Sequence, residues 1–270
     1  RQRQMCIRDR RCTQRAIMEA NTMQETALLE LRGICKFFPG VRALDGVDFT
    51  LCKGEIHALM GENGAGKSTL IKVLTGVYSK DEGTISMEGT PVQIRTTQDA
   101  LKAGISTVYQ EITLCPNLTV AENLYIGRTK GAFTNWRKMN ADAKKLLSSL
   151  GIPAAPTQQL SSCSIAVQQM VAIARAVDME CKVLILDEPT AVLTTQETVE
   201  LFKELRNLKE QGYTIVFISH KLNEIMEITD RLTIMRGGRS MGVYNTCDVT
   251  KEEISRLMVG RDVILNVQKD

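Results

Sequence analysis

The chain has 270 residues, of which 43% are hydrophobic and 24% charged, and its formal net charge is +3. This length and composition are typical of one large globular domain or two small ones, and they exclude a disordered, collagen-like or disulfide-scaffold protein. No apolar run approaches the roughly 18 residues that a membrane-spanning helix needs, so we expect any membrane role to come through a partner.

The positive charge is concentrated in the amino-terminal tail. Residues 1–18 contain six arginines and one aspartate, and the rest of the chain has 28 basic and 30 acidic residues. The tail has no apolar core or cleavage site, so it is not a signal peptide. A nucleic-acid-binding arm and a disordered or non-native extension both fit it. We favour the second, assign residues 1–22 to it, and expect the native start at Met18 or Met23.

The first half of the chain is predicted to consist mainly of strands. Apolar residues that alternate or run together between glycine and proline turns indicate strands, and apolar residues at helical spacing indicate one helix. The predicted strands are 28–38, 47–51, 55–60, a hairpin of 84–87 and 92–94 around Glu88 and Gly89, and 105–109, and the predicted helix is 67–77.

The second half is predicted to alternate helices with strands. Residues 118 to about 161 have helical spacing at 120–126 and 141–150, which indicates a helical insertion. The elements predicted after it are helices 167–177, 195–211 and 251–259 and strands 183–186, 214–218, 232–235 and 241–244. Fully apolar strands that alternate with helices predict an α/β fold with a parallel sheet covered on both faces.

The eight cysteines show no metal-binding pattern. None stand in a C-x-x-C pair, and the chain has only two histidines, His57 and His220. A zinc site is therefore not indicated. Cysteines scattered among strands and helices fit reduced thiols, several of them in the core.

A phosphate-binding loop is indicated at residues 61–68, where GENGAGKS matches the pattern G-x-x-x-x-G-K-[ST]. It stands between an apolar strand and an amphipathic helix, which is the context that the motif requires. The glycines let backbone N–H groups approach phosphates, and the helix N-terminus favours an anion. Lys67 can neutralise phosphate oxygens, and the Ser68 hydroxyl can bind Mg²⁺. The predicted ATP-binding residues of this loop are Gly61, Glu62, Asn63, Gly64, Ala65, Gly66, Lys67, Ser68 and Thr69.

Two acidic residues, Asp187 and Glu188, directly follow the apolar strand 183–186. Ligands of open α/β sheets bind at the carboxyl ends of the strands. We expect Asp187 to hold Mg²⁺, directly or through water, and Glu188 to orient and polarise the attacking water. Two solvated carboxylates without such a role are the alternative, which the intact phosphate loop disfavours.

With these two motifs the chain resembles the ATP-binding subunits of ATP-binding cassette (ABC) transporters, over about residues 28–260. The resemblance implies a P-loop NTPase fold of the ABC ATPase type, with a mostly parallel core sheet, an antiparallel β subdomain and a helical subdomain at about 115–178. It implies a nucleotide-binding domain at residues 23–262 and, at 263–270, the start of a linker to a possible second nucleotide-binding domain.

Further residues fall in the family's order. Gln110 resembles the glutamine that reaches Mg²⁺ and the attacking water, and His220 resembles the switch histidine that contacts the γ-phosphate. Phe38 stands where an aromatic ring stacks on adenine, and residues 191–194 resemble the loop that crosses to the partner domain. Taken singly, Phe38 and His220 also fit core or capping positions. As a set, the resemblance implies Glu188, His220 and Gln110 as catalytic residues and Ser68, Gln110 and Asp187 as Mg²⁺ ligands.

The signature helix departs from the family's pattern. Where the family has a Leu-Ser-Gly-Gly-Gln string, this chain has Cys163, Ser164, Ile165, Ala166 and Val167. Both glycines are missing, and the Cβ atoms of Ile165 and Ala166 hinder a close backbone approach to a γ-phosphate. We therefore expect this chain to complete an opposing ATP site poorly.

This departure, with the strings FPGVRALDGVDF, GENGAGKSTLIKVLTGVY, QQMVAIARAV and RLMVGRDV, resembles the first half of the tandem monosaccharide importers. The resemblance implies an ATPase that powers sugar import at the cytoplasmic face of the membrane, with ATP and Mg²⁺ as cofactors and no nucleic-acid partner. It implies a second nucleotide-binding domain, membrane permease subunits and, indirectly, a periplasmic or extracellular sugar-binding protein as partners. Residues 114–122 are the expected groove for a coupling helix of the permease, or else a plain subdomain hinge.

Two other functions stay open. An ATPase of the same superfamily that acts on ribosomes or DNA usually carries basic linkers or a coiled-coil insertion, and the slightly acidic body of this chain shows neither. These 270 residues alone are also expected to bind ATP without appreciable turnover if a second domain is needed to complete the site.

Overall fold

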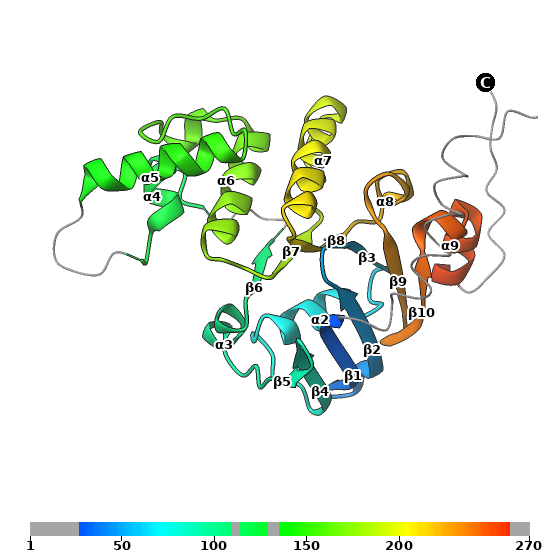
Figure 1. Ribbon diagram of the computed structural model, residues 1–270. Coiled ribbons are helices and arrows are strands. Elements are labelled where there is room, and N and C mark those ends of the chain that lie inside the picture. The colour runs from blue at the N-terminus through cyan, green and yellow to red at the C-terminus, as the bar shows by residue number, and fades with distance from the viewer. Residues whose placement is uncertain (1–26, 110–113, 129–134, 260–270) are drawn as a thin grey trace, which may run out of the picture.

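Two β-sheets and a group of helices make up the structure, a computed structural model that describes residues 27–109, 114–128 and 135–259 (Figure 1). The tail assigned to residues 1–22 and the linker assigned to residues 263–270 lie outside the described residues.

The first sheet is antiparallel and has the strand order β2-β1-β4-β5. Its strands are β1 (Ala27–Phe38), β2 (Val41–Cys52), β4 (Glu82–Met87) and β5 (Thr90–Pro91). The second strand of the predicted hairpin is wrong, because β5 is Thr90–Pro91 and not 92–94. Glu88 and Gly89 both have positive φ, 49° and 75°, so they reverse the chain in two residues and pair Met87 with Thr90.

The second sheet has six strands in the order β10-β9-β3-β8-β7-β6 and is parallel except for β10, which pairs with β9 in the antiparallel sense. Its strands are β3 (Ile56–Met60), β6 (Ile105–Val108), β7 (Val183–Asp187), β8 (Thr214–Ile218), β9 (Arg231–Arg236) and β10 (Arg239–Asn245). Every residue of β3 and β8 is buried, as expected for central strands covered on both faces. The prediction of a mostly parallel core sheet is confirmed.

Two apolar clusters cover the two faces of this core sheet. In β3, Ala58 and Met60 belong to the cluster on the side of the helical group, whereas Leu59 belongs to the cluster shared with the antiparallel sheet. In β8, Phe217 and Val216 divide in the same way. This alternation is the period of two that a strand imposes on its side chains.

The helices around the core sheet are α2 (Lys67–Leu74), α3 (Thr97–Lys102), α7 (Thr195–Glu210), α8 (Leu222–Ile228) and α9 (Lys251–Val259). The prediction that the first of them reaches residue 77 is wrong, because Gly76 adopts a φ of 70° there. A Cβ at Gly76 would lie 2.2 Å from the carbonyl oxygen of Thr96, so only glycine fits this turn. The short helices α3 and α8 were not predicted from the sequence.

The residues of the predicted helical insertion contain α4 (Val120–Tyr125), α5 (Trp136–Ser149) and the 3-10 turn η1 (Leu160–Ser162), and the helix predicted after it is α6 (Ile165–Asp178). In Figure 1 these helices, drawn in green, form a group apart from the antiparallel sheet. They pack on one another through buried Leu124, Ala143, Leu147 and Val171.

Among the residues that the structure describes, no helix is both long and apolar enough to cross a bilayer.

Candidate functional site

The loop between β3 and α2 is built on three glycines, Gly61, Gly64 and Gly66, with positive φ of 155°, 83° and 104°. A Cβ at Gly61 would lie 2.4 Å from the carbonyl oxygen of Met235, and one at Gly66 would lie 2.8 Å from that of Ala43. Only glycine fits these two positions. At Gly64 no atom lies within 4 Å of the position of a Cβ, so the loop faces open space there.

The turn between β9 and β10 supports this loop through backbone hydrogen bonds. The N–H of Gly238 donates to the carbonyl of Ala65 at 3.0 Å, and the carbonyl of Gly238 accepts from the N–H of Asp45 at 2.8 Å. The loop is therefore fixed to both sheets. This support was not predicted from the sequence, where its signal is the glycine pair Gly237 and Gly238, both with positive φ.

Lys67, at the start of α2, folds its side chain back over the loop. Its Nζ donates to the carbonyl oxygens of Gly61 at 2.6 Å and Glu62 at 3.1 Å. Burial lowers the pKa of the Lys67 ammonium, and the nearby carboxylates of Glu188 and Asp187 oppose that shift. This places a cation beside the two acidic residues. Ser68, the next residue, is exposed on the first turn of the same helix.

Asp187 ends β7, directly beside Ile218 at the end of β8. Burial raises the pKa of Asp187, the charge of Glu188 raises it further, and Lys67 and Lys72 oppose the shift. The carboxylate is thus held in surroundings that disfavour its negative charge. A bound cation would relieve this unfavourable state.

Glu188 is held in a backbone conformation that is rare for residues other than glycine, with a φ of 47°. Its N–H donates to the carbonyl of Ile218 at 3.0 Å, and its Oε1 lies 3.1 Å from Nδ1 of His220. The His220 side chain is 65% exposed and that of Glu188 26% exposed. This pair can therefore meet a ligand that arrives from solvent.

The structure brings four of the predicted residues together at the carboxyl ends of β3, β7 and β8: Lys67, Asp187, Glu188 and His220. The predicted Gln110 follows β6 and lies outside the described residues.

Phe38 ends β1 and is 37% exposed. Its ring makes an edge-to-face contact with Tyr78, with 5.3 Å between the ring centroids, and Nζ of Lys36 lies 5.6 Å from the Phe38 centroid. Lys72, on α2, places its Nζ 5.4 Å from the centroid of Tyr78. Tyr78, which shares this aromatic and cationic cluster, was not predicted from the sequence as a site residue.

The signature-like residues begin α6 in the helical group. Ser164 is the N-cap, and its hydroxyl accepts from the N–H of Val167 at 3.3 Å. Ile165 is 45% exposed. Within the described ranges, no hydrogen bond or ion pair joins residues 163–167 to Lys67, Asp187, Glu188 or His220.

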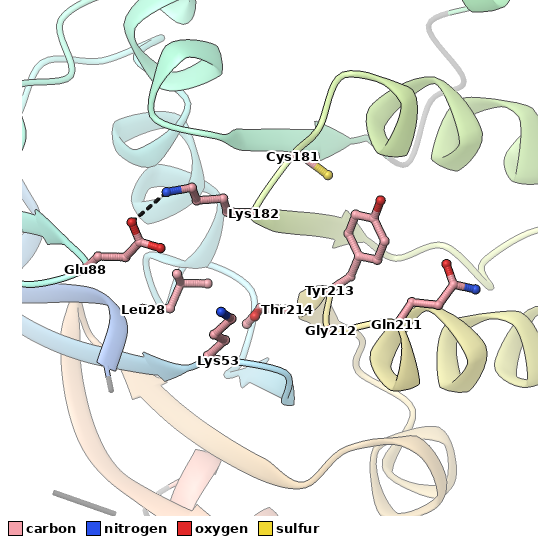
Figure 2. A pocket seen from close by; sticks show the side chains of 9 residues that line it. All are labelled: Leu28, Lys53, Glu88, Cys181, Lys182, Gln211, Gly212, Tyr213 and Thr214. Carbon is pink, nitrogen blue, oxygen red and sulfur yellow. Dashed lines mark hydrogen bonds and ion pairs between the residues drawn. The ribbon is translucent and has the colours of Figure 1, made fainter. Parts of the chain in front are cut away.

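A cavity of about 240 Å³ lies at the other end of the strands, at the amino ends of β7 and β8 (Figure 2). Cys181 and Tyr213 line it, and Lys182 forms an ion pair with Glu88 at 2.6 Å beside it. Burial raises the pKa of Cys181 to about 11, so the thiol stays protonated at neutral pH and is a poor nucleophile or metal ligand. This cavity contains none of the predicted site residues, and we take the phosphate loop as the candidate site.

Comparison with known proteins shows the family of the chain. Residues 44–191 match the family model described as "ABC transporter". The chain belongs to the ABC transporter family. A ribose import ATP-binding protein of Rubrobacter xylanophilus is 50% identical over 238 residues, which are 87% of this chain and 48% of that protein. A galactofuranose transporter ATP-binding protein of Escherichia coli strain K12 is 48% identical over 244 residues, 90% of this chain and 49% of that protein.

A third ABC relative, a fructose import ATP-binding protein of Bifidobacterium longum, is 51% identical over 237 residues, 87% of this chain and 46% of that protein. The chain therefore spans about half the length of these curated relatives.

Solved structures confirm the ABC ATPase fold. The ADP conformation of an ATP-binding cassette of an ABC transporter has a TM-score of 0.76 and 27% identity, and the match covers 87% of this chain and 95% of that chain. The structure of cbiO1 from Clostridium perfringens, part of an ABC transporter complex, has a TM-score of 0.75 and 26% identity, covering 86% of this chain and 93% of that one.

Proposed function

We propose that this chain is the ATP-binding and ATP-hydrolysing part of an ABC importer of a monosaccharide. The observation that carries the proposal is the meeting of Lys67, at a glycine-built phosphate loop, with Asp187, Glu188 and His220. The sugar class comes from the relatives, which are named as import proteins for ribose and fructose and a transporter protein for galactofuranose.

The residues fit a bound ATP with Mg²⁺. At Gly61 and Gly66 neighbouring carbonyls leave no room for a Cβ, and at Gly64 the loop is open, as a cradle for phosphate groups requires. The Ser68 hydroxyl and the Asp187 carboxylate are the hard oxygen donors that Mg²⁺ prefers. We propose Gln110 as a further ligand on the resemblance alone. When bound, Mg²⁺ would neutralise charge on the phosphate oxygens.

Each residue of the site then has a defined task. Nζ of Lys67 exchanges the carbonyls of Gly61 and Glu62 for phosphate oxygens. Glu188 orients and polarises the attacking water, and its hydrogen bond to His220 fixes the direction of its carboxylate. The exposed imidazole of His220 contacts the γ-phosphate from the side of β8. We propose that Phe38 stacks on the adenine.

The unusual start of α6 bears on the partners. Ile165 and Ala166 replace the glycines that approach a γ-phosphate across the interface in the family, so we propose that the Lys67 site is completed by a second nucleotide-binding domain with an intact signature. The length of the relatives, about twice the matched region, supports a fused second domain. The assembly would stand at the cytoplasmic face of the membrane, beneath permease subunits that receive sugar from a binding protein.

We propose that the exposed residues 115–117 form part of the groove for the permease. The first of them is held by Asn123 of α4, a buried residue whose Oδ1 accepts from the N–H of Cys115 at 2.7 Å and whose Nδ2 donates to the carbonyl of Cys115 at 2.9 Å. A segment with a fixed backbone and exposed side chains suits a rigid partner surface.

The Glu188→Gln variant of the complete gene product tests this function. Glutamine keeps the shape of Glu188 but removes the negative charge, so we expect ATP to remain bound while its hydrolysis falls by about 10²-fold or more. Hydrolysis is measured as phosphate release and trapping as retained labelled ATP.

The matched control is Glu210→Gln, the same change at an exposed position at the end of α7, which should leave both readouts unaltered. Undiminished hydrolysis in Glu188→Gln would contradict the role of this residue. Hydrolysis that responds to nucleic acid and not to the permease would favour an ATPase of another kind.

A further inference from the structure

A polar cluster, buried except for its lysine, lies next to Glu188 and His220 in the chain. We call it the Glu224 cluster, and it consists of Thr190, Ser219, Lys221 and Glu224. The hydroxyls of Thr190 and Ser219 both donate to Oε2 of Glu224, at 2.6 and 3.1 Å. Nζ of Lys221 lies 3.0 Å from Oε1 of the same carboxylate and also donates to the carbonyl of Thr190 at 3.0 Å.

The members of the Glu224 cluster come from the two loops that carry the catalytic pair. Thr190 stands two residues after Glu188, and Ser219 stands directly before His220. Glu224 belongs to the first turn of α8, which follows the second loop. One carboxylate oxygen therefore joins the loop after β7 to the loop after β8. The backbone joins them once more, through the N–H of Glu188 and the carbonyl of Ile218.

Burial of these polar groups costs free energy unless each of them has a hydrogen-bonding or charged partner. Thr190, Ser219 and Glu224 are only 1%, 4% and 9% exposed. A buried carboxylate is unfavourable unless hydrogen bonds and an opposite charge compensate it, and such groups specify geometry better than they add stability. The hydroxyls of Thr190 and Ser219 donate to the same oxygen of Glu224, so a shift of either loop would break one of these two hydrogen bonds. At this buried position water could not readily replace the lost partner.

We propose that Glu224 is a positioning residue, which holds the two loops together so that the Glu188 carboxylate stays at hydrogen-bonding distance from His220. This inference rests on the proposed function, because it assigns Glu224 to the geometry of ATP hydrolysis. Glu224 acts through Thr190 and Ser219 and touches neither ATP nor water at the reacting phosphate. Glu188 has a positive φ, and such an unfavoured backbone conformation persists only where its surroundings fix it. The Glu224 cluster provides such a constraint.

The test uses the complete gene product with Glu224→Gln or Thr190→Val, each nearly the same shape as the residue it replaces. A carboxylate misplaced by about 1 Å loses much of its effect, so we expect kcat for ATP to fall by about tenfold or more in both variants. ATP binding through the phosphate loop should stay within about twofold of wild type, because Lys67 and the glycines are untouched. Thr190→Ser keeps the hydroxyl and should restore most of kcat.

Glu227→Gln is the matched control for the charge change. Glu227 lies one turn further along α8, is exposed and pairs with Arg206 at 3.2 Å, so its loss should alter neither kcat nor ATP affinity. In the Glu188→Gln background, Glu224→Gln should cause no further loss of hydrolysis, because residues that act as one unit are not additive.

Two results would overturn the inference while the proposed function stands: wild-type kcat in Thr190→Val and Glu224→Gln, or a parallel fall of kcat, ATP affinity and melting temperature in both. The second would assign the Glu224 cluster to general stability. A wild-type protein that does not hydrolyse ATP would overturn the proposed function and this inference with it.

Discussion

At the scale of single residues, the site contains groups that are held in unfavourable states before any ligand binds. Asp187 keeps a charge that burial disfavours, Glu188 keeps a positive φ, and Lys67 is tied to the carbonyls of its own loop. A bound cation would relieve the charge of Asp187, and phosphate oxygens could replace the loop carbonyls at Lys67. Functional sites are where such strain is normally found.

The raised pKa of Asp187 gives a prediction about stability. In the folded protein Asp187 holds its proton to a higher pH than in the unfolded chain, whose aspartates have their ordinary pKa of 3.8. The folded state therefore loses stability as pH rises through the raised pKa, and at neutral pH the full penalty is present. Asp187→Asn should raise the melting temperature of the nucleotide-free protein at pH 7, by at most about 3 °C because the half-buried charge is partly screened by water.

Differential scanning fluorimetry in a metal chelator measures this change, and the difference between variant and wild type should shrink as the pH is lowered toward the raised pKa. The same variant should lose Mg²⁺-dependent ATP binding. A lower melting temperature at pH 7 would show that the Asp187 charge stabilises the folded protein and would contradict this account.

At the scale of elements, what the sequence could predict depended on how much of the signal was local. The phosphate loop was predictable because glycine spacing, an apolar strand and a helical repeat all fall within one short stretch. The helix α3 has a capping box of Thr96 and Asp99, but only Ala100 is buried, so it shows no apolar stripe. The helix α8 begins at Leu222, and its N-cap Lys221 makes no side-chain capping hydrogen bond, so its start carries no capping signal in the sequence.

The Glu224 cluster was missed for the same reason. Thr190 and Glu224 are separated by 34 positions in the chain, and they meet only because β7 and β8 are neighbours in the sheet. Spacing in the sequence cannot show such a contact. By contrast, the position of Asp187 and Glu188 at the carboxyl end of a buried strand could be predicted, because residues 183–186 directly before them are all apolar.

The start of α6 gives a prediction at this scale. Restoring both glycines by Ile165→Gly and Ala166→Gly should raise hydrolysis at the opposing ATP site of the complete protein, since the backbone could then approach a γ-phosphate. The helix should lose up to about 1 kcal/mol per glycine. Ala141→Gly, at an exposed position of α5, is the control that carries the helix penalty alone.

Phosphate release by the complete protein measures this effect, in a Glu188→Gln background that silences the Lys67 site. Equal rates with and without the two glycines would mean that Ile165 and Ala166 do not limit the opposing site.

At the scale of the whole molecule, two apolar clusters on either face of the core sheet join the antiparallel sheet and the helical group to the strands that carry the site. The site lies at the carboxyl ends of β3, β7 and β8, where the Glu188 and His220 side chains can meet a ligand. The chain spans about half the length of these curated relatives, and a second nucleotide-binding domain and a membrane partner remain our proposal.

The most direct measurement of the central claim is ATP hydrolysis by the complete protein assembled with its permease in vesicles, with and without sugar-loaded binding protein. We expect hydrolysis to rise on the order of 10-fold when the loaded binding protein is present. Its binding energy at the permease would favour the arrangement in which the two nucleotide-binding domains are closed and hydrolyse ATP. Glu188→Gln should abolish the rise. Hydrolysis that is indifferent to both the permease and the sugar would contradict the assignment of this chain to sugar import.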